Sequence, residues 1–223
     1  MDQGLAGALT SFELMWPQTY KVLTTPPATV SPPLPYEYRY YVLLDSMGSD
    51  PESDSQHFHK LLEQALEKKI IQDAVPATST SAINRFWTIR EDVEPMVGAC
   101  TYAQQFDISL PIPLIGGTVE RMVKELAQLP EVDQVFTFGH VADGNVHLVV
   151  GKRNQDQQLT GQINDLVYGP LKDLGGSISA EHGIGQHKKS YLYISRTDQE
   201  IQLMKTLKQT MDPHNILNPG KII

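Results

Sequence analysis

The chain has 223 residues, which fits one large domain or two small ones, and a hydrophobic fraction of 40%, which suffices for a globular core. Its net charge of −8 argues against nucleic acid and anionic membranes as partners. Cys100 is the only cysteine, so an intramolecular disulfide is excluded, and no apolar run approaches the roughly 20 residues that span a bilayer. Since the first residues lack the basic region of a signal peptide, we expect a cytoplasmic protein.

The N-terminal half alternates helices with short strands. Apolar residues spaced three and four apart indicate helices, and β-branched or aromatic runs indicate strands. The predicted elements are a helix over Leu5–Leu23 interrupted near Pro17, an extended proline-rich connector over Pro26–Pro35, a strand over Tyr36–Asp45, an amphipathic helix over His57–Lys69, a strand over Ile70–Val75 and a helix over Ser81–Val97.

The C-terminal half contains the clearest strands. Strands are predicted over Gln104–Leu110, Asp133–His140 and Asn145–Gly151, and helices over Thr118–Leu129, Leu159–Leu174 and Asp198–Met211. Thr118 is a candidate N-cap, and Gly175 should end the second of these helices. Because the clearest strand pair is an antiparallel hairpin, we predict an α+β fold, an antiparallel sheet with helices packed on one face and a C-terminal helical segment.

The predicted hairpin brings two histidines together. Asp143-Gly144 between strand-like runs is typical of a two-residue type I′ turn. Such a turn would place His140 opposite His147, with their Cβ atoms about 4.5–5.5 Å apart. Both imidazoles could then bind one divalent metal. The alternative is two ordinary polar residues beside a turn.

A third metal ligand is expected in the glycine-flanked loop that contains Glu181 and His182. A carboxylate beside an imidazole supplies a ligand, Glu181, and a general base, His182, in one loop. The alternative is a charged pair on a solvated loop. Asn145 could hydrogen-bond a substrate or hold the turn, and turn chemistry is the simpler role. Nothing in the sequence matches a dinucleotide fingerprint, a P-loop, a GxSxG elbow or an HExxH motif.

Four segments resemble the C-terminal domain of the FAD-linked oxidases. The run from Phe138 to His147 resembles the family's GHxxDGNxH signature, and Glu181 to Gly185 followed by Lys188 resembles its SxEHGxG motif. Phe106 to Pro111 is similar to its YDVSLP strand, and Asp212 to Lys221 to its closing DPxxILNPGK segment. The four segments occur in the family's order within residues 90–223, and the stretch 1–89 resembles the start of the same domain.

The resemblance implies a flavin-dependent dehydrogenase that oxidises a D-2-hydroxy acid such as D-lactate, D-2-hydroxyglutarate or glycolate. His140, His147 and Glu181 would bind zinc or another divalent metal, and His182 would take the hydroxyl proton. Arg90 would bind the substrate carboxylate, although a helix-surface arginine is the alternative reading. Asn218 would lie near FAD. The cap domain would be ferredoxin-like. The resemblance leaves open whether the protein forms a homodimer.

The same resemblance predicts the domain organisation. Residues 1–35 would form an entry helix and connector, 36–174 the cap sheet and helices, and 175–223 the active-site loop and C-terminal helix. The N-terminal FAD-binding domain is absent from the chain and would be supplied in cis or as a separate subunit. We therefore expect the chain alone to bind no FAD tightly and to be inactive.

The resemblance is incomplete at Gln105 and Val149, where some members place a basic residue and an asparagine. Both differences argue against a dicarboxylate substrate. Two other classes of function remain open from the sequence. One is a metal-dependent hydrolase or lyase that uses the same His-His-Glu site, and the other is a non-catalytic domain that only packs against a partner.

Overall fold

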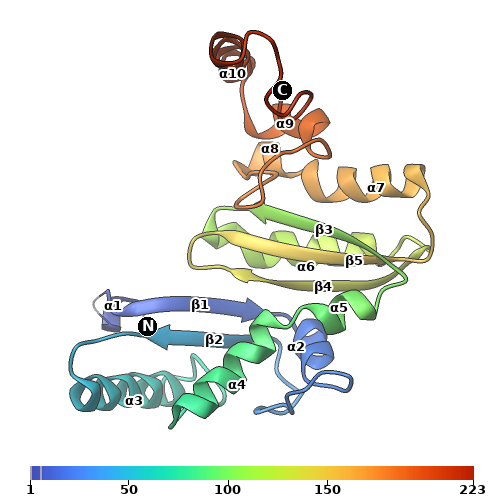
Figure 1. The fold of residues 1–223 in the computed structure, drawn as a ribbon. Helices are drawn as coiled ribbons and strands as arrows, with labels where there is room; N and C mark the ends of the chain where they lie inside the picture. Colours follow the sequence, from blue (N-terminus) through green and yellow to red (C-terminus); the bar gives the residue numbers. More distant parts are fainter. Residues whose placement is uncertain (1, 6) are drawn as a thin grey trace. The chain divides into compact units, whose positions relative to one another are not determined.

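The structure is a computed structural model that describes residues 2–5 and 7–223 (Figure 1). The chain divides into two compact units, the first within residues 1–99 and 136–142 and the second within 100–135 and 143–223. Strand β4 (Val132–His140) contributes residues to both units. The strand order is β2-β1-β4-β5-β3, and every pairing resolved within a unit is antiparallel, which confirms the predicted α+β class.

The first unit is built on β1 (Leu9–Met15) and β2 (Tyr41–Ser46), with the end of β4 beside β1. The helix predicted over Leu5–Leu23 is therefore wrong for residues 9–15, while residue 6 lies outside the described part of the chain. Helix-forming residues occur in this stretch, but β1 pairs on both edges, and these long-range hydrogen bonds outweigh local propensity.

The remaining elements of the first unit are helical. They are α1 (Asp2–Leu5), α2 (Pro17–Leu23), α3 (Pro51–Glu67), α4 (Thr80–Glu91) and α5 (Glu94–Gly98). The single helix predicted over Ser81–Val97 is broken between α4 and α5, because Pro95 cannot continue a helix from the preceding turn. The strand predicted over Ile70–Val75 does not form, and this segment contains bends without regular secondary structure.

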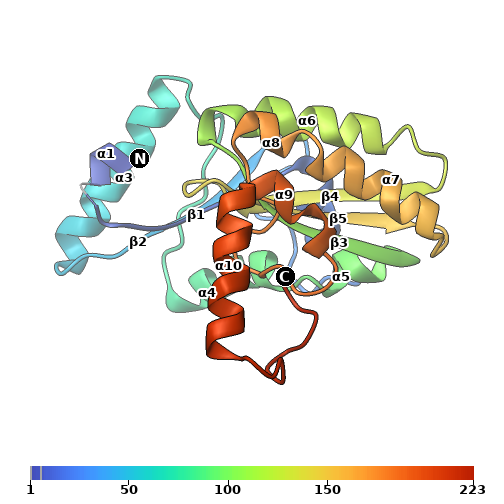
Figure 2. The ribbon, with the colours of Figure 1, turned by 90° about the horizontal axis from the view of Figure 1, so that it is seen from above.

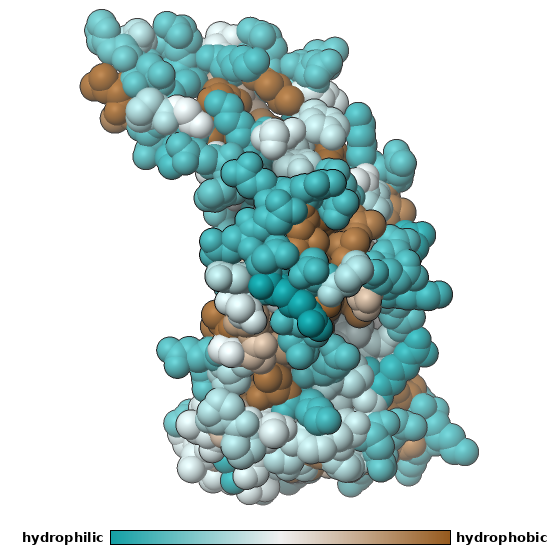
Figure 3. All heavy atoms as spheres, turned by 90° about the vertical axis from the view of Figure 1, so that its right-hand side faces the viewer, coloured by the Kyte–Doolittle hydropathy of each residue, from teal (hydrophilic) through white to brown (hydrophobic). Residues whose placement is uncertain are grey.

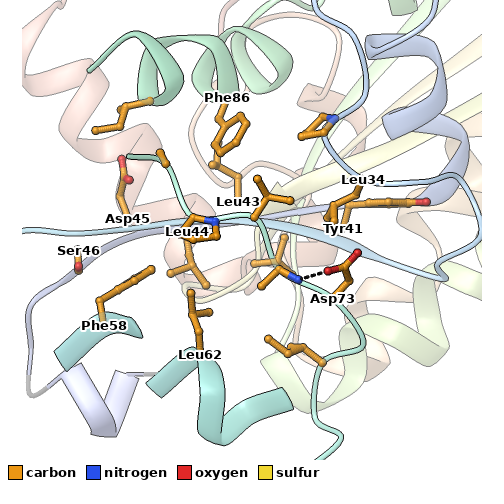
Figure 4. Close-up of a pocket in the computed structure, with 18 of the residues that line it drawn as sticks. Leu34, Tyr41, Leu43, Leu44, Asp45, Ser46, Phe58, Leu62, Asp73 and Phe86 are labelled. Atoms are coloured by element: carbon orange, nitrogen blue, oxygen red, sulfur yellow. Dashed lines mark hydrogen bonds between the residues drawn. The ribbon is translucent and has the colours of Figure 1, made fainter. Parts of the chain in front are cut away.

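A large pocket of about 950 Å³ surrounds β2 in the first unit. Figure 4 shows Leu62 from α3 and Phe86 from α4 among the side chains that line it. α3 starts at an Asp50 cap that accepts a hydrogen bond from the Ser53 backbone N–H, yet it buries none of its residues fully. α3 is therefore only partly buried against the rest of this unit.

The second unit has a well-buried core around β5. Its elements are β3 (Tyr102–Ser109), η1 (Ile112–Leu114), α6 (Ile115–Leu126), β5 (Asn145–Lys152), α7 (Gln157–Tyr168), α8 (Leu171–Leu174), η2 (Lys189–Tyr191), α9 (Leu192–Ser195) and α10 (Asp198–Met211). Every residue of β5 is buried. α6 and α7 cover one face of β3 and β5 (Figure 2). Val119, Met122 and Leu126 of α6 are completely or almost completely buried there.

Helix boundaries in the second unit correct two predictions. Thr118 does not cap α6, because the helix begins earlier and Thr118 is buried inside it. The helix predicted over Leu159–Leu174 is broken at Gly169-Pro170 into α7 and α8, and Gly175 ends α8 with a φ of 68°. α10 has the predicted bounds and begins with a Thr197–Glu200 capping box.

The face in Figure 3 is largely hydrophilic, with apolar side chains in separate patches. Within the described ranges, no helix has the length and apolar character needed to cross a membrane.

Candidate functional site

The turn after β4 differs from the prediction. Four residues, from Val141 to Gly144, separate the end of β4 from the start of β5. Gly144 has a positive φ of 89° but Asp143 does not, so the turn is not type I′, which needs positive φ at both residues. Only glycine fits here, since a Cβ would lie 2.5 Å from the Leu110 carbonyl oxygen.

His140 lies in the first unit, in a cluster with two buried charged residues. The strand register places it opposite Glu13, and its Nδ1 lies 2.6 Å from Glu13 Oε1. The other Glu13 oxygen accepts a hydrogen bond of 2.7 Å from Arg90 Nε. Arg90 Nη2 lies 3.3 Å from His140 Nε2. If Nδ1 carries the proton, Nε2 has the lone pair that accepts from Arg90.

Arg90 is buried, which excludes the helix-surface alternative. Its guanidinium carbon lies 4.7 Å from the centre of the Phe138 ring, and its Nε is occupied by Glu13. Neither contact was predicted. The interaction with Phe138 and Glu13 fixes the plane of the guanidinium, since both contacts require a particular orientation.

His147 lies in the second unit, opposite Asp107 in the pairing of β3 with β5. Asp107 is completely buried, and its Oδ1 lies 3.7 Å from His147 Nδ1. The His147 ring stacks on the ring of His182 with centroids 5.5 Å apart and an interplanar angle of 19°. Asp107, His147 and His182 each offer a ligand atom within 4.8 Å of the others.

The loop that carries Glu181 and His182 is held by the same aspartate. Asp107 Oδ2 accepts hydrogen bonds from the backbone N–H groups of Ala180 at 3.0 Å, Glu181 at 2.8 Å and His182 at 2.8 Å. Consecutive N–H groups directed at one point form an anion-binding nest, which Asp107 fills. Lys188 Nζ lies 3.9 Å from the same oxygen.

The charge state of Asp107 follows from these contacts. Burial raises the pKa of the Asp107 carboxyl, but the N–H groups of His182 and Glu181 and the nearby charges of His182 and Lys188 lower it more. The net pKa lies below the ordinary value, so Asp107 is a carboxylate at neutral pH.

A cavity of about 300 Å³ adjoins this loop within the second unit. Its walls come from Ser109, Asp143, Asn145, Ser179, Ala180 and Glu181. Asn145 is 3% exposed, and among the described residues neither atom of its side-chain amide has a hydrogen-bond partner. Its backbone N–H is bonded to the Asp143 carboxylate, so the side chain is not needed for the turn. The amide is thus available to a ligand.

The structure places the predicted site residues in three regions. His147, Glu181, His182 and Asn145 belong to the second unit, with Glu181 and His182 exposed and adjacent to the cavity or to His147. His140 and Arg90 are together in the first unit. Asn218 is exposed in the loop after α10, with a φ of 47°. The remaining histidines, His57, His59, His187 and His214, are exposed.

Comparison with known sequences identifies one protein family that matches the chain. Residues 4–222 match the sequence profile of the FAD linked oxidases, C-terminal domain. This match covers nearly the whole chain and includes all four segments on which the resemblance was based. It fits the flavin-dependent reading and not the hydrolase, lyase or non-catalytic alternatives.

Three curated relatives illustrate the match. A mitochondrial Schizosaccharomyces pombe protein named as a D-lactate dehydrogenase is 36% identical over 98% of this chain and 43% of its own length. Mitochondrial D-2-hydroxyglutarate dehydrogenase of Danio rerio is 34% identical over 84% of the chain and 35% of its own length. D-2-hydroxyglutarate–pyruvate transhydrogenase of Saccharomyces cerevisiae is 33% identical over 86% and 40%, respectively. The chain thus spans less than half of these relatives.

The expectation of a cytoplasmic protein is corrected by this comparison, because the relatives from S. pombe, D. rerio, rice and Arabidopsis thaliana are named as mitochondrial. The prediction relied on the first residues of the chain. Since the chain matches only part of each relative, those residues carry no information about targeting.

Proposed function

We propose that this chain, which belongs to the family of the C-terminal domains of FAD-linked oxidases, forms the substrate- and metal-binding part of a dehydrogenase that oxidises D-2-hydroxy acids to 2-oxo acids. The whole of residues 1–223 would act as this one functional domain. Its partners would be a small 2-hydroxy acid and an FAD-binding domain, in cis or as a separate subunit. A homodimer is a further proposal, which sedimentation of the chain can test.

The proposed metal ligands are His140, His147 and Glu181. The observation that carries this proposal is a buried carboxylate facing the Nδ1 atom of each histidine within its own unit. Metal-binding histidines usually direct their second ring nitrogen at a carboxylate or carbonyl in this way. The six residues between His140 and His147 also limit how far apart the two can lie. Zinc fits a set of two imidazoles and one carboxylate that leaves a position open.

The roles of the other residues follow from their chemistry. His182 would accept the proton of the substrate hydroxyl at its imidazole, Arg90 would bind the substrate carboxylate, and Asn145 would donate or accept a hydrogen bond from the cavity wall. Asn218 would lie near the flavin. When bound, the metal lowers the pKa of a coordinated hydroxyl and FAD accepts the hydride.

Gln105 and Val149 support a monocarboxylate substrate. They are directly opposite each other in the β3–β5 ladder, two positions along from the Asp107–His147 pair and therefore on the same face of the sheet. Neither carries a charge that could bind a second carboxylate. D-Lactate should therefore be a better substrate than D-2-hydroxyglutarate.

Two measurements test the proposal. Zinc binding to the 223-residue chain, followed by calorimetry, should fall by at least tenfold in His140→Ala, His147→Ala and Glu181→Gln, whereas the exposed His214→Ala serves as the matched control. No zinc binding by the wild-type chain would contradict the metal site. The chain joined to its FAD-binding part should oxidise D-lactate with an artificial electron acceptor. Activity that is independent of flavin would contradict the assignment as a dehydrogenase.

A further inference from the structure

We infer that Glu13 and Asp107 are positioning residues, each of which faces the Nδ1 atom of the histidine opposite it and favours a proton there, so that Nε2 keeps the lone pair that a metal would bind. Neither carboxylate was among the residues predicted from the sequence. The inference rests on the proposed metal-binding function of His140 and His147. It adds the reason why these two imidazoles would have a fixed tautomer and orientation.

The strand register supplies the first argument. Glu13 is the direct partner of His140 in the β1–β4 ladder, and Asp107 is the direct partner of His147 in the β3–β5 ladder. Directly opposed side chains share a face of a sheet and lie close enough to interact. The same arrangement, a carboxylate across from a histidine, therefore occurs independently in each unit.

Burial supplies the second argument. Glu13 is 3% exposed and Asp107 is fully buried, and a buried charge is costly unless its oxygens are well paired. The Glu13 oxygens are divided between Arg90 and His140. The Asp107 oxygens are divided differently, since Oδ2 receives the backbone N–H groups of the loop. Within the described residues, Oδ1 accepts no hydrogen bond and faces His147 Nδ1 at 3.7 Å.

A proton on Nδ1 makes both arrangements favourable. For His140 it gives a hydrogen bond of 2.6 Å to Glu13, and for His147 it directs an N–H toward an otherwise unsatisfied carboxylate oxygen. The opposite tautomer would place the Nδ1 lone pair against a carboxylate, which is repulsive. Both histidines should therefore carry their lone pair on Nε2, where that of His140 accepts from Arg90 Nη2 in the metal-free chain and would exchange this hydrogen bond for a bound metal.

Asp107 has a second positioning role that Glu13 lacks. Through Oδ2 it fixes the backbone of Glu181 and His182, and through Oδ1 it faces His147. One side chain thus sets the positions of a proposed ligand, the proposed base and a second proposed ligand. An isolated bridge between Ser109 and Ser177 holds the start of the same loop beside β3.

The first test measures the tautomers of the wild-type chain directly. Nitrogen-15 spectra of the histidine rings of the metal-free protein, recorded where the rings are neutral, should show Nδ1–H for both His140 and His147. Nε2–H at both positions would overturn the inference, and Nε2–H at one would overturn it for that residue. This result does not depend on whether any metal binds, and it needs no variant that could fail to fold.

The second test uses Glu13→Gln and Asp107→Asn, which preserve shape while removing the charge. Zinc affinity should fall about 10- to 100-fold in each. Asp133→Asn is the matched control, because Asp133 also has a buried carboxylate oxygen without a hydrogen-bond partner in the described structure but does not face His147, and its zinc affinity should not change. Unchanged affinity in both test variants would overturn the inference.

Amide exchange separates positioning from ligation. Asp107→Asn should speed exchange of the Ala180, Glu181 and His182 amides, whereas Glu181→Gln should lower zinc affinity and leave those amides protected. If Asp107→Asn abolishes zinc binding while His140→Ala retains it, Asp107 is a direct ligand together with His147 and His182, and the positioning role is wrong. Failure of the wild type to bind zinc would refute the proposed metal function, while the tautomers would still decide the inference.

Discussion

The two units stabilise a buried carboxylate opposite a histidine by different means. In the first unit, Glu13 is compensated by one side chain, the guanidinium of Arg90 at 2.7 Å. In the second unit, Asp107 is compensated mainly by three backbone N–H groups, with Lys188 at 3.9 Å. A charge paired with a side chain depends on one residue, whereas a charge paired with the backbone depends on the shape of a loop. The units should therefore respond differently to substitution.

The largest effect is expected for Arg90→Met. Removing the guanidinium leaves Glu13 buried beside only His140, and breaking one partner of a buried ion pair typically costs about 3–5 kcal/mol. Urea unfolding followed by circular dichroism would measure the change in the free energy of unfolding. Arg85→Met is the control, because Arg85 is exposed on the same helix, and it should change stability by less than about 0.5 kcal/mol. Equal effects of the two substitutions would show that the Glu13–Arg90 pair is not a stabilising unit.

The sequence predicted one half of each carboxylate–histidine pair. The segment from Phe138 to His147 predicted that His140 and His147 are site residues, and β4 and β5 have nearly the predicted bounds. Glu13 could not be found, because it is 127 residues from His140 and because its strand was predicted as a helix. Which strands pair depends on the whole chain and not on local propensity.

The role of Asp107 as a buried, paired carboxylate was nearly predictable from the sequence. It lies in a predicted strand between Phe106 and Ile108, and a charged residue within such an apolar run is a signal for a buried, paired carboxylate. Its hydrogen-bond partners are backbone N–H groups that lie 73 to 75 residues further along the chain. No side-chain pattern encodes an acceptor for N–H groups, so the nest was not predictable.

Packing gives a second contrast between the units. Leu126 of α6 is fully buried in the second unit, whereas Leu62 of α3 lines the large pocket of the first. Leu126→Ala should cost about 2–5 kcal/mol, because it removes buried surface and leaves a cavity. Leu62→Ala should cost only about 1 kcal/mol. Thermal unfolding of the two variants measures the difference, and an equal loss would mean that α3 is packed as firmly as α6.

Lys188→Met should lower the free energy of unfolding less than Arg90→Met does. The pair of variants therefore compares how strongly Asp107 and Glu13 each depend on a cationic side chain. Asp107 retains its three backbone donors when the ammonium is removed, so less of its charge is left uncompensated than that of Glu13 in Arg90→Met. Burial lowers the pKa of Lys188 while Asp107 raises it, and the net shift is downward, so the charge is not strongly stabilised by its site. A loss as large as that of Arg90→Met would show that the backbone nest does not compensate Asp107.

A third carboxylate, Asp212, is paired both with a side-chain cation and with backbone N–H groups. Substitution of its cationic partner should have the smallest effect, confined to the loop after α10. It lies beside the Lys208 ammonium and accepts hydrogen bonds of 2.9 Å from the N–H groups of Ile216 and Leu217. The Lys208 side chain lowers the pKa of Asp212, burial opposes this, and the two N–H groups lower the pKa further, so that the net shift is downward.

The direction of this pKa shift determines the pH range in which the Asp212 carboxylate stabilises its loop. A carboxyl with a lowered pKa in the folded state stabilises its loop fully above the unfolded value of about 3.9, and this contribution is lost as the pH falls through the lower folded value. The Ile216 and Leu217 amide shifts should therefore stay constant from neutral pH to about 4 and move only below it. In Lys208→Met the transition should move upward, because the largest cause of the lowered pKa is removed. A wild-type transition well above this range would show that backbone and side-chain partners together do not hold the carboxylate, and the contrast between Glu13 and Asp107 could not then be extended to this loop.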